Sequence, residues 1–188
     1  MIRTIILTAA IGAAALPALA EDRREAGAHE HGHGRLDIAI EGRQVSMALD
    51  VPAADIVGFE HEAKTKDQKA KVAAAKKTLA DPLKVFAVPA DAGCKLANAK
   101  VEFGSEKGHD DGHKHKEDAG KAEAEHSEIR AEYTLDCAAP EKITGIEFKY
   151  FELFSGAEEL DVNVASDKGQ TKYEVTRKKP SVTLGEVG

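Results

Sequence analysis

The chain has 188 residues, a formal net charge of −7 at pH 7 and 42% hydrophobic residues, but no tryptophan. This length and composition fit one domain with a modest core. The acidic balance excludes nucleic acid as a partner class, because phosphate binding needs clustered positive charge, and it favours a protein that attracts cations.

The first twenty residues are typical of a cleaved signal peptide. A positive start at Arg3 precedes an apolar run, and Ala18-Leu19-Ala20 is the small-x-small pattern that signal peptidase cuts. The run is shorter than the roughly 20 apolar residues that a membrane-spanning helix needs. We therefore expect residues 1–20 to be removed, and residues 21–188 to be exported without a membrane span.

Residues 21–34 are polar and rich in glycine and histidine, which predicts a flexible arm ahead of a single domain over 35–188. Two segments that flank the turn Glu41-Gly42 then alternate apolar with polar or small residues. Their apolar positions are Leu36, Ile38 and Ile40, then Val45, Met47, Leu49 and Val51. This period of two predicts a β-hairpin.

A surface helix is predicted over about 67–80, after a connecting segment over 52–62. Thr65 or Asp67 could cap its start, and Asp81-Pro82 stops it. Its apolar face is weak and consists of Ala70, Ala73, Ala74 and Leu79. We expect this helix to lie on the surface of a sheet.

The two cysteines, Cys94 and Cys137, favour a disulfide over half of a zinc site, because the chain is exported and has no C-x-x-C spacing. Residues 94–103 and 128–137 are predicted to form one antiparallel hairpin that brings the two cysteines together. This register places Cys94, Leu96 and Phe103 opposite Cys137, Leu135 and Glu128, respectively. The apolar phase changes after Leu96, which predicts a β-bulge near Asn98.

The tip of this hairpin is an insertion over 104–127, rich in His, Asp and Glu, which is too polar to order itself. Further strands are predicted at 143–150, 160–165 and 171–176. An aromatic cluster is expected to supply much of the core: Phe148, Tyr150, Phe151, Leu153 and Phe154. The predicted fold class is α+β, a mainly antiparallel β-sheet or sandwich-like domain with one surface helix, a long loop insertion and a disulfide.

Seven of the eight histidines fall in two short stretches. Imidazole nitrogens and carboxylate oxygens are common ligands of zinc. The ligand candidates are His29, His31 and His33 in the arm, His109, Asp110, Asp111, His113, His115 and His126 in the insertion, and the isolated His61. Without free thiols, zinc, nickel, cobalt and copper(II) all remain candidates. A lone histidine such as His61 is also commonly an ordinary surface residue.

An enzymatic role is not expected. The chain has no H-E-x-x-H motif, no G-x-S-x-G elbow and no phosphate-binding glycine loop. A catalytic metal also needs a rigid site with an open coordination position, which flexible histidine loops do not provide.

Motifs along the whole mature chain resemble ZrgA-like proteins. They are the stretch from His29 to Gly42, the stretch from Val51 to His61, Asp81-Pro-Leu, Ala92-Gly-Cys94, the insertion, Tyr133-Thr-Leu-Asp-Cys137 and Gly169-Gln170. The resemblance implies a Gram-negative periplasmic protein that captures or buffers zinc and assists a high-affinity zinc import system. Its implied partners are zinc ions and the periplasmic binding protein of a zinc ABC transporter.

We hypothesise that His29, His31, His33 and His61 form the better-ordered site, and that the insertion adds weaker, mobile ligands. Three alternatives stay open at this point. The chain could be a metal-responsive envelope interaction module, a periplasmic nickel, cobalt or copper protein, or a plain β-domain with incidental histidines.

Overall fold

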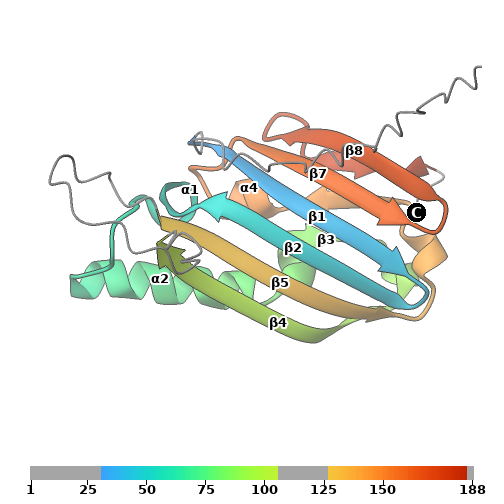
Figure 1. The fold of residues 1–188 in the computed structure, drawn as a ribbon, viewed down its shortest axis with the longest axis horizontal. Coiled ribbons are helices and arrows are strands. Elements are labelled where there is room, and N and C mark those ends of the chain that lie inside the picture. Colours follow the sequence, from blue (N-terminus) through green and yellow to red (C-terminus); the bar gives the residue numbers. More distant parts are fainter. Residues whose placement is uncertain (1–30, 106–126, 186–188) are drawn as a thin grey trace, which may run out of the picture.

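The computed structural model describes residues 31–105 and 127–185. Their strands form a six-stranded sheet in the order β4-β5-β2-β1-β7-β8 and a three-stranded sheet in the order β3-β6-β9. Figure 1 shows α2 and β3 behind the six-stranded sheet. The fold is therefore mostly β-sheet with few helices, as the sequence predicts.

The strands of the large sheet are β1 (His33–Glu41), β2 (Gln44–Pro52), β4 (Cys94–Ser105), β5 (Ser127–Cys137), β7 (Glu159–Ser166) and β8 (Gly169–Thr176). Those of the small sheet are β3 (Phe86–Ala87), β6 (Gly145–Phe148) and β9 (Ser181–Thr183). The helices are α1 (Ala53–Val57), α2 (Lys66–Leu79), α3 (Pro82–Val85), α4 (Tyr150–Leu153), and the 3-10 turns η1 (Ala90–Ala92) and η2 (Pro140–Lys142).

The predicted first hairpin is confirmed, with Leu36 opposite Leu49 and Ile40 opposite Val45. Its apolar side chains all face the core, whereas the alternate residues face outward. Beside it, β1 pairs in parallel with β7, while every other pairing between the described strands is antiparallel. No local pattern in the sequence predicts this parallel pair. β1 begins at His33, inside the interval that we assigned to the flexible arm.

The pairing of β4 with β5 confirms both the disulfide and the bulge. Cys94 lies opposite Cys137 and is bonded to it, and the register shifts between Leu96 and Asn98. The bulge adds one residue to β4, so Phe103 faces Ile129 and the predicted pairing of Phe103 with Glu128 is wrong. β4 extends to Ser105 and β5 begins at Ser127.

The predicted surface helix is α2, and Thr65 caps it through a capping box with Gln68. Ala75 and Leu79 are buried in the core, and Val72 packs against it. These positions share one face because they are three and four residues apart. The predicted face was wrong for Ala70, Ala73 and Ala74, which are exposed. Alanine suits exposed and buried helix positions equally, so it marks no face.

The aromatic segment is divided between a strand and a helix. The predicted strand over 143–150 is confined to β6, and α4 follows it. Tyr150 and Phe151 are both buried, although a strand would point these neighbours to opposite sides. One helical turn brings both to the same core with Phe154, whereas Leu153 is 48% exposed and not part of the core.

The large sheet has two distinct ends. We call the end that contains the start of β1, the end of β2, the start of β5 and the start of β7 the histidine end. The opposite end contains the disulfide, and we call it the disulfide end. No helix in the described ranges is long and apolar enough to cross a membrane.

Candidate metal site

His31 and His33 lie at the histidine end, on either side of Gly32. The Nδ1 atom of His31 is 3.3 Å from Oε1 of Glu60, which follows α1. The Nδ1 atom of His33 is 3.6 Å from Oε1 of Glu159, its partner residue in the parallel β1–β7 pair. Both imidazoles are largely exposed, with side-chain exposures of 65% and 44%. Each histidine is therefore paired with a carboxylate at Nδ1 and is accessible to solvent.

A carboxylate at Nδ1 is a common arrangement around protein-bound zinc. The carboxylate accepts the Nδ1 proton, fixes the orientation of the ring and leaves Nε2 as the metal donor. Glu60 and Glu159 lie at ion-pair distance from Nδ1 of His31 and His33, respectively, on the side of each ring where such a carboxylate acts. The alternative is that the carboxylates themselves bind the metal, which their oxygen atoms also allow.

The turn between the two histidines is held at both of its peptide groups. The Gly32 N–H donates to Oδ1 of Asp55 at 2.8 Å. The Gly32 carbonyl accepts from the backbone N–H groups of Glu158 and Glu159, both at 2.8 Å. Gly32 itself has φ +87°, a left-handed conformation that favours glycine.

Asp55 is buried although it is charged. Burial raises the pKa of its carboxyl group, and the hydrogen bond from Gly32 lowers it. His31 and His33 also act to lower this pKa, while Glu60 acts to raise it. Asp55 thus interacts electrostatically with both histidines and contributes negative charge beneath the turn that joins them.

His61 lies in a different environment. Its ring stacks on Phe59, with ring centroids 5.1 Å apart. Its Nδ1 lies 3.0 Å from the carbonyl oxygen of Glu62, and its Nε2 lies 3.4 Å from Nε2 of Gln68, the residue that completes the α2 capping box. The structure therefore connects His61 to the start of α2, and none of its described contacts involves His31 or His33.

The remaining predicted ligands lie outside the described residues: His29, His109, Asp110, Asp111, His113, His115 and His126. The described residues that flank them are nevertheless informative. Ser105 pairs with Ser127, and Glu128 pairs with Pro52 at the end of β2. The insertion therefore leaves and rejoins the sheet at the histidine end, where β1 also begins.

Within residues 31–105 and 127–185, no three His, Cys, Asp or Glu side chains gather closely enough to hold a metal ion. Each histidine–carboxylate pair offers two donor groups, fewer than the four ligands that zinc prefers. His31 and His33 are ligands predicted from the sequence, whereas Asp55, Glu60 and Glu159 were not predicted. The adjacency of Glu60 to His61 was visible, but no local signal connects Glu60 to His31.

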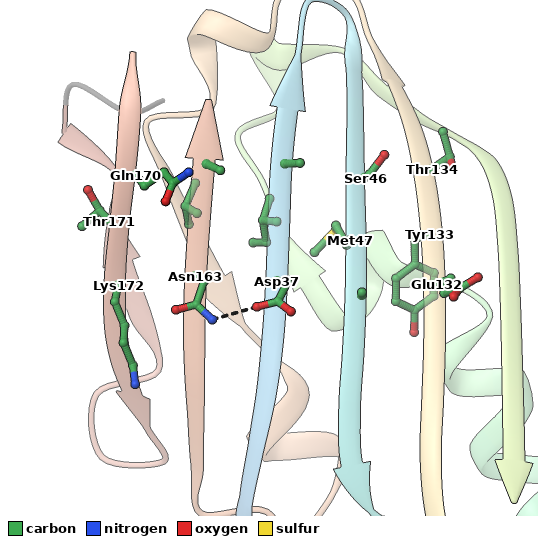
Figure 2. A pocket seen from close by; sticks show the side chains of 15 residues that line it. Asp37, Ser46, Met47, Glu132, Tyr133, Thr134, Asn163, Gln170, Thr171 and Lys172 are labelled. Carbon is green, nitrogen blue, oxygen red and sulfur yellow. Dashed lines mark hydrogen bonds between the residues drawn. The ribbon is translucent and has the colours of Figure 1, made fainter. Parts of the chain in front are cut away.

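A second surface feature is a trough of about 720 Å³ on the outer face of the large sheet. Figure 2 shows Asp37 accepting a hydrogen bond from the Asn163 side chain across the β1–β7 pair, with an N···O distance of 2.7 Å. Small side chains such as Ala39, Ser46 and Ala165 form part of its lining. The trough contains no histidine, so it is separate from the candidate metal site.

Comparison with known proteins identifies the family. The family model described as ZrgA family zinc uptake protein matches residues 28–184, which include both histidine–carboxylate pairs and the disulfide. No curated protein matches the chain. The match extends over most of the chain, and we conclude that this protein belongs to the ZrgA family of zinc uptake proteins.

Proposed function

We propose that this protein captures zinc in the periplasm and assists its delivery to a zinc importer, in a binding rather than a catalytic role. The observation that carries the proposal is the position of the two pairs, His31–Glu60 and His33–Glu159, at the end of the sheet where the insertion is attached. Family membership supports a role in zinc uptake. Export by a signal peptide over residues 1–20 is part of the proposal.

The chemistry of the site suits zinc. Zinc prefers four ligands in a tetrahedral arrangement, and His31 and His33 offer two imidazole nitrogens. We propose that His29, His61 or a histidine of the insertion supplies the others. Acidic side chains at the site and the net charge of −7 favour the approach of a divalent cation.

A site that is exposed and draws its ligands from several segments also suits a protein that must release its metal. Closed four-ligand sites hold zinc as part of the fold, whereas ligands on separate segments can be exchanged one at a time. We propose that zinc passes in this way to the periplasmic binding protein of a zinc ABC transporter. Nickel, cobalt or copper would use the same donors, so metal competition decides selectivity.

The test is a zinc titration of residues 21–188 against a chromophoric chelator. The variants are His31→Ala with His33→Ala, His61→Ala, and a deletion of residues 106–126. Asp136→Asn serves as the control, because this exposed carboxylate lies at the disulfide end. We expect the double variant to lose at least tenfold in affinity, as loss of ligands or of their orienting partners commonly does.

If only the deletion variant loses tight zinc binding, the main zinc site lies in the insertion. An unchanged affinity in the double variant would refute the proposed role of His31 and His33. If the unmodified protein does not compete with the chelator, zinc capture itself is refuted. A metal-dependent complex with a protein other than a zinc transporter component would favour an interaction module instead.

A further inference from the structure

Asp55 is an unusual residue to bury. Among the described residues only Asp55 and Glu128 are both charged and buried, and Asp55 is 5% exposed. A buried carboxylate costs free energy unless hydrogen bonds compensate it. A hydrophobic residue would fill this position in α1 at lower cost if packing were its only role. We therefore expect the contacts of this carboxylate to account for its presence.

Its hydrogen-bond partner is the backbone N–H of Gly32, the residue between the two histidines. Oδ1 of Asp55 accepts from the Gly32 N–H at 2.8 Å, and Glu158 and Glu159 donate to the Gly32 carbonyl. Gly32 is thus hydrogen-bonded to α1 through its N–H and to the start of β7 through its carbonyl oxygen. A Cβ atom at Gly32 would also lie 3.2 Å from Cγ of Glu158, so the turn is closely packed.

Asp55 is itself firmly held. A Cβ atom at Gly156 would lie 2.6 Å from the Asp55 carbonyl oxygen and 2.7 Å from its Cα, so only glycine allows this approach. The loop that contains Gly156 is tied down by Arg177, whose guanidinium donates to the carbonyl oxygens of Phe154 and Ser155 at 2.9 and 3.0 Å. The backbone of Asp55 therefore packs against a loop that Arg177 holds in place.

We propose that Asp55 is a positioning residue of the metal site: through Gly32 it sets the directions in which His31 and His33 leave the backbone. This inference rests on the proposed zinc capture by these two histidines. One hydrogen bond acts on both, because Gly32 is their common neighbour. Orienting partners of metal ligands typically change metal affinity 10- to 100-fold when they are removed.

The test compares Asp55→Asn with Asp55→Ala in the chain over residues 21–188. Asparagine keeps a side-chain oxygen that can accept from Gly32, whereas alanine removes it. We expect the zinc affinity to fall about tenfold or more in D55A and to stay within about threefold of the unmodified value in D55N. Amide hydrogen exchange at Gly32, measured without zinc, is expected to accelerate in D55A but not in D55N.

Two further variants separate positioning from stability. Ile40→Val weakens the core near the disulfide end, so it is expected to leave zinc affinity and Gly32 exchange unchanged. If D55A does not fold, Gly32→Ala replaces it, because alanine disfavours φ +87° and leaves Asp55 in place. We expect G32A to lose zinc affinity as D55A does.

Equal loss of affinity in D55N and D55A would overturn the proposal, because charge and not the hydrogen bond would then matter. Unchanged affinity or unchanged Gly32 exchange in D55A would overturn it as well. These outcomes differ from failure of the proposed function, in which the unmodified protein itself would not bind zinc.

Discussion

Removal of the disulfide tests whether stability and metal binding are located at opposite ends of the sheet. The disulfide joins Cys94 in β4 to Cys137 in β5, 43 residues apart in the chain. Both are replaced by alanine, because Cys137 is fully buried and a serine hydroxyl there would lack compensation.

The loss of stability follows from the length of the closed loop. In the chain-entropy model, a loop of this length corresponds to about 4 kcal/mol at 25 °C. For a domain of this size, each kcal/mol shifts the melting temperature by roughly 2–4 °C, so we expect a decrease of roughly 8–16 °C. Deleting residues 106–126 halves the loop, which lowers the contribution of the disulfide by about 0.6 kcal/mol.

The assay is urea unfolding of the C94A/C137A variant, followed by zinc titration of the folded protein. We expect unchanged zinc affinity, since the 11 residues of β5 separate the two ends by roughly 30 Å. Reduction of the unmodified protein is a control for stability only, because thiol reductants bind zinc. A stability loss below about 1 kcal/mol would refute the entropic reasoning. A lower zinc affinity in the folded variant would refute the separation of the two ends.

Four further results are expected. Arg177→Lys should lower the free energy of unfolding by about 2 kcal/mol, measured in urea, because lysine cannot replace the several guanidinium bonds to the loop before β7. Tyr133→Phe should be neutral or stabilise by about 1 kcal/mol in thermal unfolding, because the buried Tyr133 hydroxyl has no hydrogen-bond partner among the described residues. Burial raises the pKa of Asp55, so ionised Asp55 costs stability at neutral pH, and this cost disappears as the pH falls through the raised pKa. The stability of D55N relative to the unmodified protein, measured in urea, should therefore be greater at pH 7 than at pH 4. Zinc affinity should weaken steeply below about pH 6, because protons compete for imidazole nitrogens, and a chelator titration that is flat to pH 5 would instead indicate carboxylate ligands.

Local sequence patterns were sufficient for several elements. The alternation of apolar residues predicted β1 and β2, and Thr65, one of the two predicted capping residues, caps α2. The change of apolar phase after Leu96 predicted the bulge, and the cysteine positions predicted the register of β4 with β5 as far as Leu96. Each of these depends on neighbours along the chain or on one hairpin, so the information lies within a short segment.

The sequence by itself also determined the chemistry that the protein can offer, because residue types alone identify histidines and carboxylates as metal donors. Which donors meet was decided only by the tertiary structure. His33 reaches Glu159 because β1 pairs in parallel with β7, and His31 reaches Glu60 because the chain returns to the histidine end through α1. The contact of Gly32 with Asp55 arises in the same way. Such contacts join segments with no shared local pattern, since strand order and packing of the whole domain set them.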